Sequence, residues 1–383
     1  MALDRRGRVV PMHRIQIAVI LIVTLLGLSA QGVEFCVSPT GNDTWSGRLR
    51  GPNAAKVDGP FATLTRARDA IRELRRGQGL TERVTVTVCG GTYFLADTFV
   101  LSAEDSGTAT CPVTFRAAPG ETAVLVGGRA VTGWRKGGNG IYVTSLRDQG
   151  ITRFRFHQLF FRGQRQVLAR HPNLDPEHPH TGGLLYVDEA SYESGKAFHY
   201  APGEIPFAEW GAVSQAEVNI YPYNCWDHNI IPIRSVDAEI RHIRLRYAVA
   251  GKIREGNRYF IQNVRNALDA PGEWHVDYAT GELSFLPPGG SVAEGDVVVP
   301  LLENVIAISG TEAEPVRHVN VHGFRFMVAE QDAVTLEGAE HCKITGNVVT
   351  NIGGIGINVG FLRNARRGVG NRWRRGPNRK VPS

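Results

Sequence analysis

The sequence lacks the short motifs that identify the commonest metal sites and hydrolase nucleophiles. None of its five cysteines forms a Cys-x-x-Cys pair, which argues against a zinc site. Neither Gly-x-Ser-x-Gly nor His-Glu-x-x-His occurs, and no glycine-rich phosphate loop is present. We therefore expect no metal and no cofactor. The spacing does not decide whether two of Cys36, Cys89 and Cys111 form a disulfide. Cys342 fits an apolar interior position.

Positive charge is scarce in the body of the chain, although the 383 residues carry a formal net charge of +6. Residues 1–32 contribute +3 and residues 363–383 contribute +8, which leaves −5 for everything between them. A nucleic-acid partner would need a basic stripe on the folded part. We expect no nucleic-acid binding, and a basic, disordered tail over residues 363–383.

No apolar run is long enough to be a typical membrane span. The longest, Ile15–Ala30, has sixteen residues, follows Arg14 and ends in small side chains. This layout is typical of a secretory signal, and an uncleaved membrane anchor is the alternative. We interpret residues 1–32 as a signal peptide with a possible upstream extension. The mature protein is then secreted or periplasmic and does not contact the membrane after cleavage.

A repeat near the C-terminus predicts the architecture. The segment His318–Gly323 returns as His341–Gly346, and both copies alternate apolar with small or polar residues. Strands that repeat at such an interval, without helical spacing between them, predict an all-β solenoid, namely a right-handed parallel β-helix. Like residues would stack about 4.8 Å apart. The predicted interior columns are Val319/Cys342, Val321/Ile344 and Ile306/Val334/Ile357.

One helix and one irregular region interrupt this pattern. Apolar residues at helical spacing after Thr63 predict a capping helix that covers the first rung, with Thr63 as N-cap and Gly77 as the stop. Between residues 151 and 297 the repeat disappears, and short strands with Pro/Gly turns predict an inserted β-sandwich-like region. The expected domains are the cap and first coils at 33–150, the insertion at 151–297 and further coils at 298–362.

Several segments resemble secreted bacterial proteins of the pectin-lyase-like superfamily of right-handed β-helices. They read VSPTGND, GPFATLTRARDAI, GGTYFL and PVTFRAAPGETAVLVGG. They are similar to the start of β-helical glycoside hydrolases of the family 120 and 141 type, over roughly residues 33–362. The resemblance implies the fold and export, but not one reaction, because the fold hosts several chemistries. It also implies catalytic acids on later coils of longer relatives.

The segment Asn224–Asn229 holds a polar and aromatic group that suits a sugar. Trp226 could stack on a sugar face while Asp227 and His228 bind hydroxyls or transfer protons. The alternative is a turn in which Asp and Asn bond their own backbone. Arg170 could bind a substrate carboxylate, or anchor the insertion.

Three carboxylates near one strand form the other candidate group. Glycoside hydrolysis needs a carboxylate pair, so Asp332 and Glu337 are catalytic candidates and Glu330 a substrate-binding one. The alternative is that all three are solvated turn residues.

The basic tail follows the last predicted coil directly, with no capping element between them. This fits either a genuine tail that binds an acidic polymer or a truncated reading frame.

These observations lead to three hypotheses. The first is a glycoside hydrolase-like protein acting on plant or algal polysaccharide. The second is a non-catalytic glycan-binding or surface-structural protein, including an inactive truncated fragment, and the third is a polysaccharide lyase. In each case the partner is a polysaccharide or oligosaccharide, and the protein is expected to be a monomer.

Overall fold

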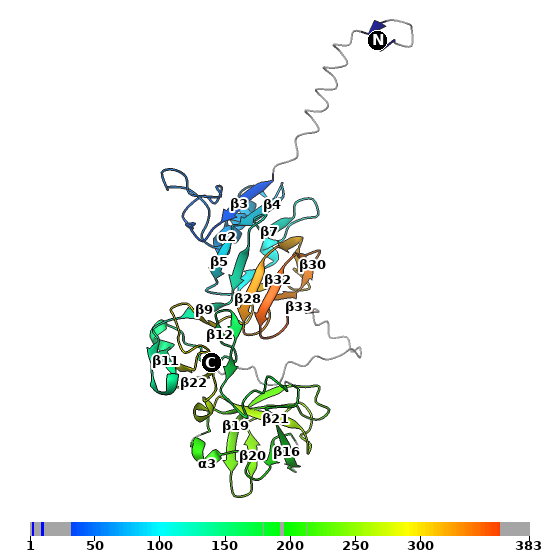
Figure 1. Cartoon of the computed structure of the whole chain (residues 1–383). Coiled ribbons are helices and arrows are strands. Elements are labelled where there is room, and N and C mark those ends of the chain that lie inside the picture. The colour runs from blue at the N-terminus through cyan, green and yellow to red at the C-terminus, as the bar shows by residue number, and fades with distance from the viewer. Residues whose placement is uncertain are drawn as a thin grey trace.

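The computed structural model describes residues 2–3, 9–10, 32–178, 180–191, 195–211 and 213–360. Within them the protein is mostly β-structure, as predicted (Figure 1). The expected signal segment and basic tail fall almost entirely outside these ranges. In Figure 1 the parallel strands lie at the top, two smaller sheets in the middle and a barrel at the bottom. Near the N-terminus, β1 (Ala2–Leu3) pairs antiparallel with β2 (Val9–Val10).

Three all-parallel sheets surround one hydrophobic core. The chain passes through the sheets in turn and returns to each at the predicted spacing. Asn320 pairs with Lys343, its counterpart in the repeat, and Ile306 pairs with Val334. The pairs Val321–Ile344 and Val334–Ile357 confirm two of the predicted columns. The first sheet comprises β3 (Val33–Val37), β4 (Val84–Val88), β7 (Val113–Ala117), β27 (Val319–His322) and β31 (Lys343–Thr345); the second β5 (Gly91–Phe94), β8 (Ala123–Val126), β28 (Arg325–Ala329) and β32 (Val348–Ile352); the third β6 (Phe99–Leu101), β25 (Ile306–Ser309), β29 (Val334–Glu337) and β33 (Ile357–Val359).

The repeat also determines what lies at the turns. The rings of His318 and His341 stack with centroids 5.0 Å apart, next to the short parallel pair β26 (Val316–Arg317) and β30 (Ala339–Glu340). The side chain of Asn347 accepts a hydrogen bond from the backbone amide of Phe324 at 2.9 Å and donates one to the carbonyl of Val321 at 3.1 Å. Side chains at the turns therefore link one pass of the chain to the next.

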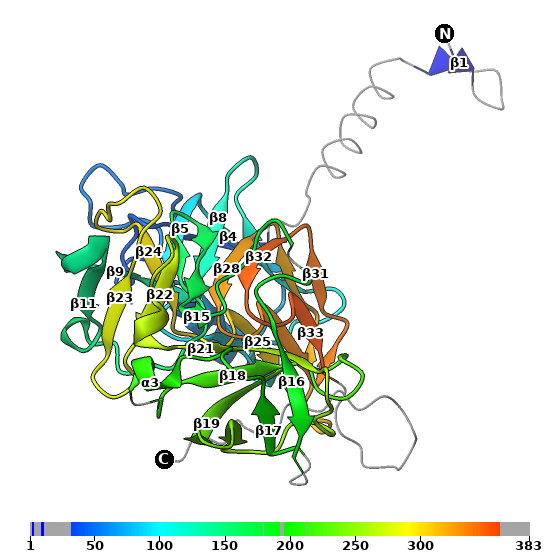
Figure 2. The ribbon, with the colours of Figure 1, turned by 60° about the horizontal axis from the view of Figure 1, so that its bottom comes forward.

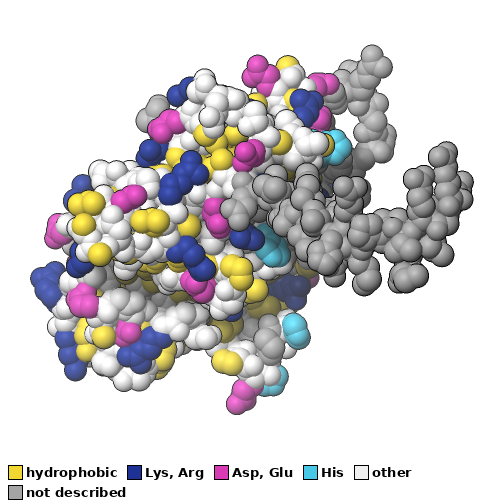
Figure 3. Space-filling view, turned by 90° about the horizontal axis from the view of Figure 1, so that it is seen from above, with side chains coloured by type: hydrophobic (Ala, Val, Ile, Leu, Met, Phe, Trp, Pro, Cys, Tyr) yellow, Lys and Arg dark blue, Asp and Glu magenta, His cyan; other side chains and the backbone are white. Residues whose placement is uncertain are grey.

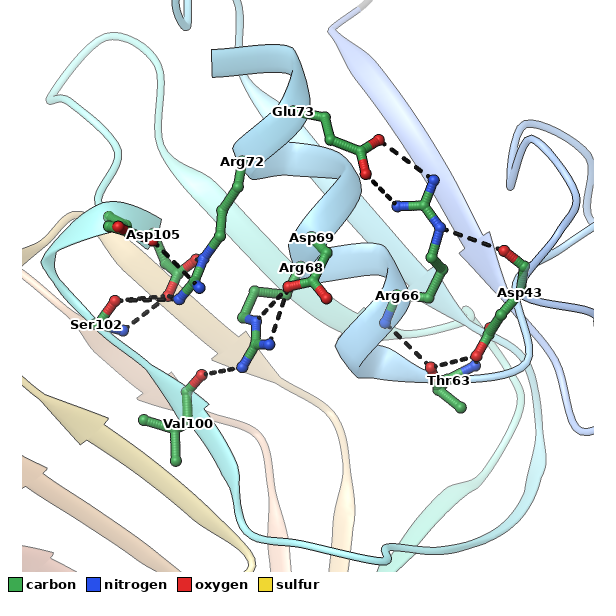
Figure 4. A network of polar contacts seen from close by, with 11 residues as sticks. Asp43, Thr63, Arg66, Arg68, Asp69, Arg72, Glu73, Val100, Ser102 and Asp105 are labelled. Carbon is green, nitrogen blue, oxygen red and sulfur yellow. Dashed lines mark hydrogen bonds and ion pairs between the residues drawn. The ribbon is translucent and has the colours of Figure 1, made fainter. Parts of the chain in front are cut away.

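Helix α2 (Leu64–Gln78) packs its apolar face onto this core. The predicted N-cap is confirmed, because the Thr63 hydroxyl accepts a hydrogen bond from the backbone amide of Arg66 at 3.1 Å. Figure 4 shows how ion pairs fix the helix, with Arg72 donating twice to the buried carboxylate of Asp105 at 2.7 Å. The predicted stop at Gly77 is wrong by two residues. Gly79 is the C-cap and ends the helix with a positive φ of 72°, which glycine adopts without steric cost.

The chain leaves the parallel sheets after β8 and rejoins them at β25, where Phe99 of β6 pairs with Ile306. Strands before and after this excursion, residues 127–305, therefore share one core.

Two smaller sheets lie next to the parallel ones. One orders β10 (Arg135–Lys136), β11 (Tyr142–Ser145), β23 (Glu282–Phe285), β22 (Glu273–Val276) and β14 (Val167–Leu168); the other orders β13 (Gln164–Arg165), β12 (Phe160–Phe161), β24 (Val297–Pro300) and β9 (Gly128–Val131).

The excursion contains a closed six-stranded barrel rather than the predicted sandwich (Figure 2). Strand β21 pairs with both β16 and β18, so the sheet returns to its own edge. Closure removes the free edges that a two-sheet sandwich would expose. Its strands are β18 (Glu217–Ile220), β19 (Asn229–Asp237), β20 (His242–Leu245), β17 (Ala197–Tyr200), β16 (Leu185–Ala190) and β21 (Arg258–Gln262), with β15 (Arg170–His171) added at β21 and helix α3 (Phe207–Trp210) beside them.

The remaining elements are short 3₁₀ turns: η1 (Ala103–Asp105), η2 (Gly138–Gly140), η3 (Arg147–Gln149) and η4 (Arg265–Ala267). All five cysteines are free thiols, and Cys342 packs against the core as expected. On the face in Figure 3, Lys and Arg side chains are interspersed with Asp and Glu. No helix of the described part of the chain is both long and apolar enough to cross a membrane.

Candidate functional site

Ionisable side chains from distant parts of the sequence meet at His157. Its Nε2 lies 2.9 Å from a carboxylate oxygen of Glu217, and its Nδ1 lies 3.1 Å from one of Glu330. Glu217 begins β18 of the barrel, whereas Glu330 follows β28 of the parallel sheets. Both carboxylates are buried, at 1% and 6% exposed. The imidazole therefore bridges two buried carboxylates where the two regions adjoin.

The charges at this cluster are strongly coupled. Burial alone would lower the pKa of His157, but its hydrogen bonds to Glu217 and Glu330 raise that pKa to about 9. Burial would raise the pKa of Glu217, yet the bond with His157 and the nearby charges lower it. At neutral pH, His157 is therefore an imidazolium and Glu217 a carboxylate. A proton donor and an ionised carboxylate thus stand in contact.

Neighbouring polar groups hold these side chains in place. Gln262 donates to Glu217 at 3.1 Å, and the Arg155 guanidinium lies 3.7 Å from the same carboxylate. The backbone amide of His157 points to Glu330 at 3.3 Å. Arg155 is half exposed, so the cluster reaches solvent on this side.

Two buried polar atoms beside the cluster have no hydrogen-bond partner among the described residues. They are the amide nitrogen of Asn219 and the hydroxyl of Tyr278. Asn219 lies two residues after Glu217 on β18, so both side chains leave the same face of the strand. Burial, followed by the charge of Glu217, raises the pKa of Tyr278, so its hydroxyl keeps its proton. Unpaired buried donors are rare and mark a place where a polar ligand or water can bind.

Two residues predicted from the sequence, His228 and Arg170, lie on the outer face of the barrel to which Glu217 and Asn219 belong. Nε2 of His228 is 2.8 Å from the amide oxygen of Asn219, and its ring stacks on Tyr221 at 4.8 Å. Desolvation, and then the charge of His157, lowers the pKa of His228. Arg170 places its guanidinium 3.5 Å above the ring of Phe260. Phe260 pairs with Asn219 across β21 and β18, which brings Arg170 to the same surface.

The Arg170 side chain is nevertheless buried and hydrogen-bonded to nearby backbone carbonyls. It is 7% exposed, and its guanidinium donates to the carbonyls of Pro172 and Gly183. Burial lowers the pKa of Arg170 to about 10, so the guanidinium stays charged at neutral pH. These contacts correspond to the anchoring alternative named above.

Trp226 and Asp227 lie in the turn that precedes His228. Trp226 is 88% exposed, and Asp227 is exposed as well. An indole so open to water is free to stack on a sugar ring.

The three predicted carboxylates separate in the structure. Glu330 belongs to the cluster at His157. Asp332 accepts the amide of Ile355 and the side chain of Asn358, each at 2.7 Å, and so links two passes of the chain. Glu337 is exposed at the end of β29.

The sequence interpretation missed His157, Glu217 and Asn219. Glu217 is 60 residues from His157 and Glu330 is 173, and none of them belongs to a repeated column or a known motif. Only the packing of the barrel against the parallel sheets brings them together. Among the described residues, no group of three or more His, Cys, Asp or Glu side chains could hold a metal ion.

Comparison with solved structures shows a shared fold. A structure described as a glycoside hydrolase superimposes with a TM-score of 0.70 at 21% identity, over 84% of this chain and 63% of the other. The chain therefore spans less than two thirds of that protein. Weaker matches are a complex of XylC with xylose (TM-score 0.32, 14% identity, 83% and 42% covered) and a tailspike of Acinetobacter baumannii bacteriophage AP22 with capsular saccharide (TM-score 0.15, 8% identity, 76% and 33% covered). No family model and no curated protein matches the sequence.

Proposed function

We propose that this chain is an exported right-handed parallel β-helix protein that acts on plant or algal polysaccharide as a glycoside hydrolase. The stacked parallel sheets and the fold shared with a protein described as a glycoside hydrolase support this class. Export rests on the apolar segment Ile15–Ala30 and its flanks.

The observation that carries the proposal is the carboxylate pair at His157 with unpaired donors beside it. Glycoside hydrolysis needs a proton donor and an ionised carboxylate at the bond that breaks, and these are the charge states of His157 and Glu217. Glu217, which is ionised, is suited to act as nucleophile or base. The imidazolium of His157 is suited to deliver a proton to the leaving oxygen. The amide nitrogen of Asn219 and the hydroxyl of Tyr278 are buried donors beside this pair, and neither has a hydrogen-bond partner among the described residues.

Turnover on a polysaccharide panel tests this assignment. We expect the purified chain to release reducing ends from at least one plant or algal polymer. Glu217→Gln and Glu330→Gln should each lower kcat at least 100-fold while circular dichroism stays unchanged. Glu239→Gln, an exposed glutamate on the barrel, serves as the matched control and should keep full activity. Equal activity in all three variants would contradict the proposal, as would calcium-dependent release of unsaturated products.

A second function, glycan binding without cleavage, is favoured by one observation. Glu217 accepts bonds from His157 and Gln262, and Glu330 from His157, so each carboxylate is already engaged. Saturation titrations separate the two functions. Binding of a polymer that Trp226→Ala weakens, with no reducing ends released, would favour binding alone.

A further inference from the structure

A polar hollow lies on the parallel sheets, away from the cluster at His157. It has a volume of about 380 Å³ on the outward side of β4 and β7. Thr85 pairs with Thr114 in register, whereas their neighbours Val86 and Phe115 point into the core. The hollow is lined by Arg83, Thr85, Ala109, Thr110, Pro112, Thr114 and Arg116.

Two arginines give this hollow its charge. The side chain of Arg83 is exposed and forms no hydrogen bond or ion pair with another described residue. Arg116 donates to the Thr87 hydroxyl at 3.3 Å, and its nearest carboxylate, on Glu34, is 3.6 Å away. None of the described residues that line the hollow carries a carboxylate, and Glu34 lies beside Arg116 alone, so the two guanidinium groups leave the hollow with a net positive charge.

One hydroxyl between the arginines, that of Thr114, is available as a donor. The Thr114 hydroxyl accepts a bond from Asn320 at 3.1 Å, so its own hydrogen is free to point into the hollow. A guanidinium beside hydroxyl donors matches the planar or tetrahedral oxygens of a carboxylate or a sulfate.

We propose that this hollow binds an anionic group of a polysaccharide, either the carboxylate of a uronic acid or a sulfate ester. The inference rests on the proposed function, because it takes the ligand to be a glycan. Since Arg83 and Arg116 both reach solvent, the contact adds selectivity for acidic polymers rather than high affinity.

Binding measured on paired polymers tests the proposal. The probes are polygalacturonate against its fully methyl-esterified form, and a sulfated galactan against the same galactan after desulfation. We expect one acidic polymer to bind at least tenfold more tightly than its neutral partner at low salt. This preference should fall as ionic strength rises. The pair that shows the preference identifies the anion as carboxylate or sulfate.

Substitutions locate the preference. Arg83→Gln with Arg116→Gln should reduce it to less than twofold. Arg135→Gln, an exposed arginine on β10, should leave it intact as the matched control. The proposal is overturned if the double variant keeps the full preference, or if the polymers bind and neither pair shows one.

A small anion separates this proposal from the proposed function. If no polymer of either kind binds, the proposed function fails, and titration with inorganic sulfate still tests the hollow. Saturable binding of sulfate that the double variant loses supports the anion site, and absence of binding overturns it.

Discussion

The parallel sheets and the barrel solve the same problem, burying one face of each strand, in different ways. In the parallel sheets each buried residue stands on a like residue from the next pass, as Ile306 stands on Val334. In the barrel, strands of unequal length curl until β21 meets β18, and the interior has no repeat. A stacked core therefore produces a periodic pattern of apolar residues in the sequence, whereas a closed antiparallel core produces none.

The two regions also differ in how their cores end. The barrel has no free edge in its ring of six strands, so its interior is enclosed. The parallel core loses its cover at the last described strands. Val334 is 0% exposed, but Ile357, the next residue in the same column, is 42% exposed. Burial in the parallel sheets therefore depends on the neighbouring pass.

The largest effect should come from a charge placed in that column. Val334→Asp buries an unpaired carboxylate and should cost on the order of 4 kcal/mol of unfolding free energy or more. Ile357→Asp, at the exposed end of the same column, should cost about 1 kcal/mol. Urea titrations of both variants check the contrast. Equal losses would show that the last strand is as well covered as the one before it.

The next effect should be confined to the barrel. Phe198 is 0% exposed and meets Tyr259 edge-to-face with centroids 4.8 Å apart. Phe198→Ala should cost about 3–5 kcal/mol through lost packing and the cavity that remains. Hydrogen exchange should then quicken in β16 to β21 and stay unchanged in β4 and β7. Faster exchange in both regions would mean that they unfold as one unit.

The junction between the regions should depend on pH. The pKa of His157 is about 9 in the folded protein against an ordinary 6.5. Its stabilising effect, about 3 kcal/mol, is therefore complete below pH 6.5 and is lost as the pH rises through 9. The lowered pKa of Glu217 adds stability above about pH 4.5 that disappears on acidification.

Unfolding free energies measured from pH 5 to 10 check this prediction. His157→Gln cannot become charged, so its stability should change less over the same range. The difference between the two curves isolates His157 from other groups that titrate near pH 9 or 10. Parallel curves would mean that His157 is not charged at the junction.

The smallest effect on stability should come from Trp226, on the barrel surface. Because its side chain is 88% exposed, Trp226→Ala should change the unfolding free energy by no more than about 0.5 kcal/mol. Glycan affinity should fall roughly tenfold if the indole stacks on a sugar. Tyr247→Ala, another exposed aromatic of the barrel region, is the matched control and should bind normally. A large loss of stability in the Trp226 variant would show a packing role instead.

Much of the fold could be predicted from particular residues. The repeat of His318–Gly323 predicted the pairing of β27 with β31, and Thr63 predicted the start of α2. The barrel was not predictable in this way, because the pairing of Leu185 with Tyr259 or of Glu217 with Gln262 leaves no periodic trace. At the candidate site, the sequence points to Glu330, His228 and Arg170. It does not point to their neighbours His157, Asn219 and Phe260.

The all-β class, the register of the stacked columns and the capped helix can all be predicted from the amino-acid sequence. Each of these depends on local alternation or on a repeat of one strand set after another, and such patterns can be read along the chain. The closure of the inserted strands into a barrel and the position of His157 between Glu217 and Glu330 depend on tertiary contacts. Those contacts join residues 60 and 173 positions apart, and they form because two separately packed cores meet at one surface.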